Sequence, residues 1–253
     1  MRDIANMSVI VTGGGSGIGA GTARHFAARG AKVTICGRRL EKVQAVADDI
    51  GPNCLGVQAD ITNAADREQL VAAAVDHGGG LDALINNAGN MYRGPITDLD
   101  ESQLLSIFHT NVIAGMMLTG LAVEHLERRQ GAVIFIGSIH TRRAYPGASP
   151  YAATKGAVQV LTRVLAAELG SRKIRVNCVV PGAVVTEINQ RAGLFTDEEA
   201  AERLQGMAGA HALGRIGTEE EIAEAIDYLT RADWTTGAIL DVDGGLGLGL
   251  TEG

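Results

Sequence analysis

The sequence contains little cysteine, proline or aromatic side chain: 3 cysteines, 5 prolines and 4% aromatic residues in a chain of 253. The cysteines, Cys36, Cys54 and Cys178, lie in separate apolar runs without the spacing of metal ligands. Their odd number argues against a disulfide framework and predicts buried free thiols in a reducing compartment, with no metal site. The scarcity of aromatic residues gives no support to a large steroid-binding platform.

The chain also lacks a basic excess and long hydrophobic runs. Lys and Arg number 22 against 29 Asp and Glu, for a formal net charge of −7. This balance argues against nucleic acid or an anionic membrane surface as the main partner. No apolar run reaches the length of a membrane span, and no signal-peptide core follows Met1. We therefore expect a cytoplasmic protein that binds neither membrane nor nucleic acid.

What the chain does contain is a regular alternation of short apolar runs and helical stretches. This pattern predicts an α/β fold, a Rossmann-like doubly wound parallel sheet of about seven strands with helices on both faces. No linker or repeat divides the chain, so residues 1–253 are expected to form a single domain. The expected strands are 7–12, 31–36, 54–59, 81–86, 132–136, 174–179 and 238–242, and the expected helices 17–29, 40–50, 64–77, 100–128 and 151–170.

A long segment after Pro181 falls outside this alternation. Residues 183–216 are the candidate substrate lid, because an insertion at the carboxyl end of a parallel sheet lies beside the ligand crevice. Thr196 followed by acidic residues is a plausible helix start within it.

A glycine-rich turn joins the first expected strand to the first expected helix. The motif is Thr12-Gly13-x-x-x-Gly17-x-Gly19. A tight turn brings backbone N–H groups against a pyrophosphate at the positive end of a helix. The predicted cofactor contacts in this turn are Gly13, Gly15, Ser16, Gly17, Ile18 and Gly19.

The end of the second strand indicates which dinucleotide binds. No acidic residue is present there to take a ribose 2′-hydroxyl; Gly37 leaves space, and Arg38 and Arg39 can pair with a 2′-phosphate. This favours NADP(H), with NAD(H) as the alternative. Asp60 and Ile61, after the third strand, are predicted to face the adenine, although Asp60 also suits a helix N-cap.

The stretch Ser149-Pro-Tyr151-Ala-Ala-Thr-Lys155 places a phenol and an ammonium on one helix face. A nearby cation lowers the pKa of a phenol, which is about 10 when unperturbed. Ser138 follows an apolar strand thirteen residues upstream of Tyr151. We therefore predict that Tyr151 is an acid–base catalyst, that Lys155 lowers its pKa, and that Ser138 holds a substrate oxygen.

Taken together, these motifs resemble the classical short-chain dehydrogenase/reductase family along essentially the whole chain. Further marks are Asn86-Asn87-Ala88-Gly89, Asn111, Pro181-Gly182 and Asp243-Gly244-Gly245. The resemblance implies a homotetramer built on long helix pairs, or a dimer. It adds to the cofactor contacts Asn87, Ala88, Gly89, Tyr151, Lys155, Pro181, Gly182, Val184 and Thr186.

The catalytic candidates are Asn111, Ser138, Tyr151 and Lys155. The same resemblance assigns roles to two of them, Lys155 and Asn111. Lys155 is expected to hold the nicotinamide ribose, and Asn111 to anchor a water that links Lys155 to solvent. The expected reaction is hydride transfer between a nicotinamide cofactor and a secondary alcohol or ketone, a reaction on CH–OH groups.

The substrate is less well defined by the sequence. His140, two residues after Ser138, resembles the histidine of glucose 1-dehydrogenases and 3-hydroxybutyrate dehydrogenases, and the segment after Pro181 resembles that of glucose dehydrogenases. This favours a sugar or a hydroxy/keto acid. Candidate substrate contacts are Ser138, His140, Tyr145, Tyr151 and Met91, with Tyr92, Gln190 and Phe195 nearby. A substrate anion could pair with Arg93, Arg142 or Arg143, although surface positions explain these arginines more simply.

Three other functions stay open. A 3-oxoacyl thioester reductase or a broad-specificity ketone reductase would use the same groups. A non-catalytic nucleotide-binding scaffold would keep the fold but needs none of the four catalytic candidates, all of which are present.

Overall fold

The computed structural model describes residues 1–186, 188, 196, 198–199, 202 and 206–249. Its centre is a parallel sheet of seven strands in the order β3-β2-β1-β4-β5-β6-β7, which confirms the predicted fold class. The strands are β1 (Ser8–Thr12), β2 (Lys32–Gly37), β3 (Cys54–Gln58), β4 (Ala83–Asn86), β5 (Ala132–Ile136), β6 (Arg175–Pro181) and β7 (Ile239–Val242).

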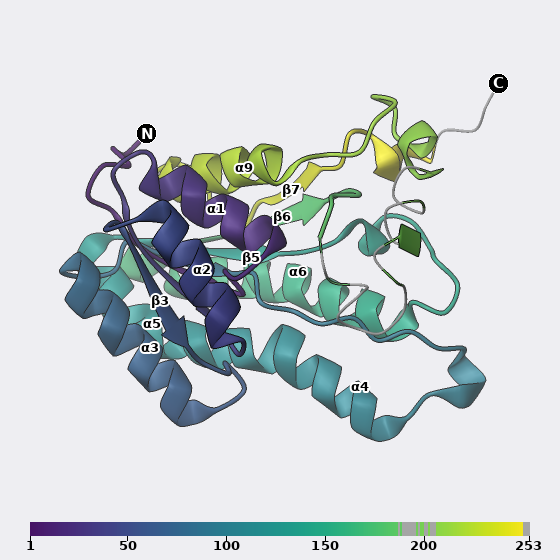
Figure 1. The fold of residues 1–253 in the computed structure, drawn as a ribbon, viewed down its shortest axis with the longest axis horizontal. Coiled ribbons are helices and arrows are strands. Elements are labelled where there is room, and N and C mark those ends of the chain that lie inside the picture. Colours follow the sequence, from purple (N-terminus) through teal and green to yellow (C-terminus); the bar gives the residue numbers. More distant parts are fainter. Residues whose placement is uncertain (187, 189–195, 197, 200–201, 203–205, 250–253) are drawn as a thin grey trace.

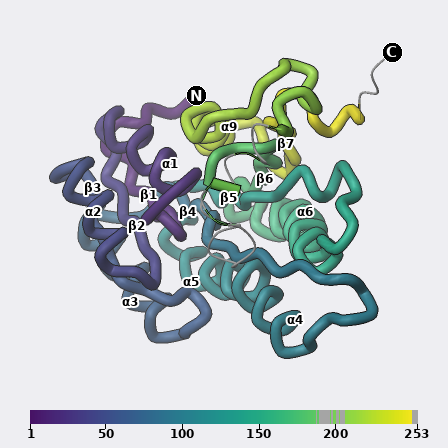
Figure 2. Tube along the Cα trace, turned by 45° about the vertical axis from the view of Figure 1, so that its right-hand side comes forward, coloured from purple at the N-terminus to yellow at the C-terminus, as the bar shows by residue number. Residues whose placement is uncertain are grey.

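Helices cover both faces of this sheet (Figure 1). The central strands β1, β4, β5 and β6 are buried along their whole length, which is why they read as continuous apolar runs. One face packs on α1 (Gly17–Ala27), α2 (Leu40–Ile50) and α9 (Glu219–Arg231), and the other on α3 (Ala64–Gly78), α5 (Ala114–Arg129) and α6 (Ser149–Leu169). Figure 2 shows α9 on one side of the strands and α3 and α5 on the other.

The strand order reverses between β1 and β4, which pair in parallel with Val9 opposite Ala83 and Val11 opposite Ile85. The chain builds β2 and β3 on one side of β1 and then crosses to the other side. Such a reversal opens a crevice at the carboxyl ends of the strands, where doubly wound proteins bind their ligands.

The expected helix over 100–128 is interrupted in its middle. The chain forms α4 (Glu101–Phe108), then a π-helical turn at His109–Ile113, then α5. A π-turn shifts the backbone pairing by one residue and is often found at functional sites. The turn carries Asn111, one of the catalytic candidates, and buries it.

The sequence analysis missed helix α9. Its start is a capping box: the Thr218 hydroxyl accepts the Glu221 N–H, and the Glu221 carboxylate accepts the Thr218 N–H at 2.9 Å. The pattern Thr-x-x-Glu before an apolar stripe was therefore a usable signal. Helix α9 packs beside α1, and buried His25 and Asp227 join the two at 3.0 Å.

The expectation that no apolar run is long enough to span a membrane is wrong for the helical stretch Glu101–Arg129. Among the described residues, this one helical stretch has the length and composition of a membrane-crossing helix, with a mean hydropathy of 1.5 and 39% of that window buried. Core helices of soluble proteins meet the same criteria. Here α5 packs against α3 and β4.

Replacing Thr218 with Ala should destabilise the protein by about 1 kcal/mol, because the α9 capping box loses its hydroxyl acceptor. Urea unfolding of the full chain measures this change. Thr218→Ser is the matched control and should stay close to wild type. Equal losses in the two variants would contradict the capping role.

Candidate active site

A cleft of about 260 Å³ lies at the carboxyl ends of the strands. Most of the predicted cofactor residues line it, drawn from six separate parts of the chain. They are Gly13, Ser16, Gly17, Ile18, Arg38, Asp60, Ile61, Asn87, Ala88, Gly89, Tyr151, Lys155, Pro181, Gly182, Val184 and Thr186. Gly15, Gly19 and Arg39 are not in its lining: Gly15 backs onto α2, Gly19 packs on the turn, and Arg39 is the exposed N-cap residue of α2.

The glycine turn requires glycine for conformation and for space. Gly13 and Gly17 have φ angles of +67° and +56°, which L side chains disfavour. A Cβ on Gly19 would lie 2.3 Å from the Gly13 carbonyl oxygen. The turn therefore stays tight, and the first N–H groups of α1, which have no partner within the helix, face the cleft. This geometry suits the turn to hold a pyrophosphate.

Thr12 ties this turn to the Asn86–Gly89 segment at the switch point. Its hydroxyl accepts the N–H groups of Asn87 and Ala88 at 3.0 and 2.9 Å and lies 3.3 Å from the Ile85 carbonyl oxygen. The Asn87 amide donates back to the Thr12 carbonyl at 2.8 Å. These bonds hold the two sides of the crevice at a fixed spacing. Sequence reasoning quoted Thr12 only as part of a motif and missed this role.

Strand β2 ends at the cleft, and the charged side chain of Arg38 follows it. Gly37 and the exposed Arg38 line the cleft, and no acidic side chain precedes them on β2. Asp60 lies across from them and accepts hydrogen bonds from the Thr62 N–H and hydroxyl at 3.0 and 2.7 Å. Partial burial raises the pKa of Asp60, but these bonds and the nearby Arg38 outweigh it, and the pKa lies below its ordinary value. Asp60 is thus both a turn-forming residue and part of the cleft.

Tyr151 and Lys155 lie on the buried side of α6, with 6% and 5% of their surfaces exposed. The Lys155 ammonium is 5.6 Å from the centre of the Tyr151 ring and donates a hydrogen bond to the Ile136 carbonyl at 2.8 Å. Ile136 ends β5, just before Ser138. The three predicted catalytic side chains Ser138, Tyr151 and Lys155 all line the cleft.

The electrostatics of this pair differ from the sequence prediction. Burial raises the pKa of Tyr151 to about 12, and a hydrogen bond with Ser138 is the contact that opposes the rise. Burial also lowers the pKa of Lys155 to about 8. Loss of hydration is therefore the largest influence on the pKa of both groups in the free protein, and residue spacing does not reveal it.

His140 completes the corner around Ser138. The Ser138 oxygen accepts the His140 N–H at 3.3 Å and lies 3.1 Å from Nδ1 of that ring. The imidazole stands between two tyrosine rings, with centres 4.6 Å from Tyr145 and 5.1 Å from Tyr151. Met91 also lines the cleft and packs on Tyr151. All five predicted substrate residues therefore meet at one end of the cleft.

Asn111 lies behind the cleft rather than in its lining. Its amide binds the backbone of Asn90, with contacts of 2.7 and 2.9 Å, and the hydroxyl of Thr154 at 3.1 Å. A cavity of about 10 Å³ adjoins Asn111, Lys155 and Asn86, and Asn86 Oδ1 is buried with no hydrogen-bond partner in the described part of the chain. That space is close to what one water molecule needs.

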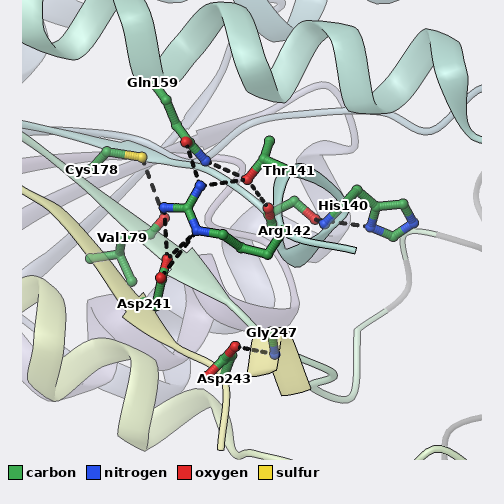
Figure 3. A network of polar contacts seen from close by, with 10 residues as sticks. His140, Thr141, Arg142, Gln159, Cys178, Val179, Asp241, Asp243 and Gly247 are labelled. Carbon is green, nitrogen blue, oxygen red and sulfur yellow. Dashed lines mark hydrogen bonds and ion pairs between the residues drawn. The ribbon is translucent and has the colours of Figure 1, made fainter. Parts of the chain in front are cut away.

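Arg142 is not among the residues that line the cleft, and Figure 3 shows its guanidinium beside Asp241 and Gln159. Its guanidinium donates to both oxygens of Asp241 at 3.1 Å and to Gln159 at 3.0 Å. Gln159 donates to the Thr141 hydroxyl at 2.6 Å, which donates to the Ser138 carbonyl at 2.8 Å. The network connects the edge strand β7 to the backbone of the catalytic loop, so Arg142 is not placed to meet a substrate anion.

The other motif residues near this loop are also structural. The Asp243 carboxylate accepts the N–H groups of Gly245 and Gly247 at 2.9 and 2.7 Å and closes the turn after β7. Arg143 is 3.4 Å from the Leu246 carbonyl and does not line the cleft, whereas Arg93 does.

Gln190 and Phe195 lie outside the described residues, as does much of the candidate lid over 183–216. Met207, which the sequence analysis did not single out, lines the cleft from the described end of that segment.

Comparisons with known proteins agree with this geometry. The family model described as short chain dehydrogenase matches residues 7–196. The chain is 36% identical over 249 residues to L-fucose dehydrogenase of Bos taurus, covering 97% of this chain and 91% of that one. A short-chain dehydrogenase/reductase of unknown function from Caenorhabditis elegans, solved with cofactor, superposes with a TM-score of 0.93 at 29% identity over 98% of both chains.

A second solved structure is a 3-ketoacyl-(acyl-carrier-protein) reductase from Brucella melitensis complexed with NADH. It superposes with a TM-score of 0.88 at 30% identity and covers 96% of this chain and 99% of that one. The matched fold, the glycine cradle and the buried Tyr151–Lys155 pair agree with one another. The chain therefore belongs to the short-chain dehydrogenase/reductase family of nicotinamide-dependent oxidoreductases.

Proposed function

We propose that this protein transfers a hydride between NADP(H) and a small polar secondary alcohol or ketone, with a sugar or a hydroxy/keto acid as the substrate class. One observation carries the proposal: Ser138, Tyr151 and Lys155 line the same cleft as the glycine cradle. A reacting carbon in that cleft has a proton donor and a hydrogen-bond donor on one side and the dinucleotide site on the other. The nicotinamide, when bound, supplies or accepts the hydride.

Tyr151 moves the proton that accompanies this hydride. With a pKa of about 12, its phenol is protonated at neutral pH and gives its proton to the substrate oxygen in reduction. Ser138 accepts the His140 N–H, which leaves the serine hydroxyl proton to be donated to that same oxygen or to His140 Nδ1. In the oxidative direction Tyr151 must first lose its proton, so a positive charge beside it is required.

Lys155 supplies part of that charge and holds the ribose hydroxyls of the cofactor. Its pKa of about 8 keeps the ammonium charged at neutral pH even though it is buried. The small cavity beside Asn111 and Lys155 can hold the water through which the proton returns to solvent. Asn111 acts on this route by shaping the cavity, because its amide is already bonded to Asn90 and Thr154.

The preference for NADP(H) over NAD(H) rests on the end of β2. Arg38 is exposed at the cleft, and β2 ends in Gly37 with no carboxylate to repel a 2′-phosphate. Arg39 supports the preference less, because it is outside the cleft lining.

The substrate class is supported by the polar corner and by relatives. His140, Tyr145 and Ser138 offer several hydrogen-bonding groups in a small space. One similar protein is named for L-fucose, a sugar, and a similar structure for a 3-ketoacyl thioester. A 3-oxoacyl thioester reductase is the second candidate for this reason.

The assembly and location belong to the same proposal. We propose a cytoplasmic homotetramer, with a dimer as the alternative, joined through the long helices. Support comes from large apolar side chains exposed along α4, the π-turn and α5: Leu105, Ile113, Met116, Met117 and Leu121. Residues 183–216 are proposed as the substrate lid, and the described Ala183 and Met207 contribute to one apolar cluster with Tyr145.

Replacing Tyr151 with Phe should lower kcat at least about 100-fold, because the proton donor is removed while the ring stays in place. Absorbance at 340 nm over sugars, hydroxy acids, secondary alcohols and ketones identifies a substrate for wild type and then measures the variant. NADPH binding by fluorescence is the control for an intact site. Turnover near the wild-type value would contradict the assignment.

Replacing Arg38 with Ala should weaken NADPH binding about tenfold and leave NADH binding nearly unchanged, because one charged contact to the 2′-phosphate is lost. Fluorescence titration with both cofactors measures this, and kcat/KM with each extends it to turnover. Arg39→Ala is the matched control and should have the smaller effect. An equal loss for NADPH and NADH in Arg38→Ala, or a strong NADH preference in wild type, would contradict the NADP(H) proposal.

A further inference from the structure

Tyr145 carries a polar atom that none of the described residues bonds. Among the residues that the structure describes, its hydroxyl oxygen is buried and has no hydrogen-bond partner. The residue lines the cleft, and the cluster packed around it, Ile139, Ala183 and Leu246, is apolar. A hydroxyl that gives up water without gaining a partner destabilises the fold, so such groups are rare without a reason. A molecule bound in the cleft is a partner that the described residues do not supply.

The position of Tyr145 relative to the reacting groups is defined by two ring contacts of His140, one tilted and one edge-on. Its ring centre lies 4.6 Å from that of His140, whose ring centre lies 5.1 Å from that of Tyr151. The His140 imidazole therefore lies between the ring of Tyr145 and the ring of Tyr151, the proposed proton donor. The Ser138 hydroxyl oxygen lies 3.1 Å from Nδ1 of the same imidazole. Ser138, Tyr145 and Tyr151 therefore line one cleft around His140.

The loop that carries Tyr145 is held in place before any substrate arrives. The Gly147 carbonyl accepts the Gly94 N–H at 2.9 Å, and the Pro146 carbonyl accepts a hydrogen bond from Arg93 at 3.2 Å. The Tyr145 carbonyl accepts the Ala148 N–H at 3.0 Å, just before α6 begins. A side chain fixed by its own backbone in this way loses little freedom when it binds a ligand.

We propose that Tyr145 is a specificity-determining residue whose hydroxyl bonds a second oxygen of the substrate, on a carbon close to the reacting one. This inference rests on the proposed function and narrows it to vicinally or closely oxygenated compounds: sugars, polyols and hydroxy or keto acids. A site built to hydrogen-bond a substrate oxygen discriminates strongly against the analogue that lacks it. Monofunctional alcohols and ketones, the substrates of a broad-specificity reductase, leave the Tyr145 hydroxyl unpaired.

A matched pair of probes tests the proposal: trans-cyclohexane-1,2-diol and cyclohexanol, which differ by one hydroxyl. Oxidation of each by NADP⁺ is followed at 340 nm in wild type and in Tyr145→Phe. Wild type should prefer the diol, and Tyr145→Phe should lower kcat/KM for the diol about tenfold while leaving cyclohexanol within about twofold. NADPH binding should be the same in both proteins.

Tyr92→Phe is the matched control, because it removes the same atom from the neighbouring loop. The Tyr92 hydroxyl already accepts the Asp100 N–H at 2.8 Å. Its removal should lower the thermal unfolding temperature and leave the diol preference unchanged. Tyr145→Phe should unfold at the wild-type temperature or above it, because the atom removed has no partner. This second readout needs no turnover.

Two results would overturn the proposal. One is a diol preference that survives in Tyr145→Phe, and the other is a fall in its unfolding temperature as large as that of Tyr92→Phe. If wild type oxidised neither probe nor any alcohol of the wider panel, the proposed function itself would fail. The unfolding temperatures would then still decide whether the Tyr145 hydroxyl is satisfied within the protein.

Discussion

The buried ammonium of Lys155 is the constraint on which the rest of the site depends. A charge removed from water is costly unless partners compensate it, and the described residues offer Lys155 the Ile136 carbonyl at 2.8 Å. Burial lowers the pKa of Lys155 to about 8, so the charge is present at neutral pH and is lost as the pH rises above that value. A ribose hydroxyl or a phenolate next to this ammonium is stabilised by the same loss of water. The Lys155 ammonium thus has little compensation in the free protein, and we expect a bound ligand to add to it.

The fold explains why this charge faces a dinucleotide site. Strand order reverses between β1 and β4, and the crevice that results is held by the hydrogen bonds between Thr12 and the Asn87-Ala88 backbone. Helix α6 follows β5 in the chain and packs against β5 and β6, which brings Tyr151 and Lys155 back over the strand that delivers Ser138. The glycine turn and the proposed acid–base groups therefore line one cleft. Chemistry needs both, and neither side alone would have been specific.

Much of this could be predicted from the sequence, because glycine spacing and apolar alternation have direct physical meanings. The strands and the glycine turn at Gly13 followed from such patterns, and Tyr151 followed from its spacing to Lys155, whereas Asn87 and Pro181 came from the resemblance to the family. The Lys155–Tyr151 electrostatics could not be predicted, since burial is a tertiary property. The ion pair between Arg142 and Asp241 could not be predicted either, because 99 residues separate the two in the sequence. The start of α9 at Thr218 was readable and was missed, and the space around Tyr145 depends on packing that no local pattern encodes.

The claim that burial, rather than Lys155, sets the state of Tyr151 in the free protein is tested most directly by titrating that one phenol. Tyrosine labelled with ¹³C at Cζ reports its ionisation by chemical shift, and Tyr151→Phe assigns the resonance. With a pKa of about 12, the free protein should keep Tyr151 protonated through pH 10, and bound NADP⁺ should bring the ionisation to lower pH. A midpoint near pH 7 in the free protein would contradict the account, because Lys155 alone would then be sufficient to ionise the phenol.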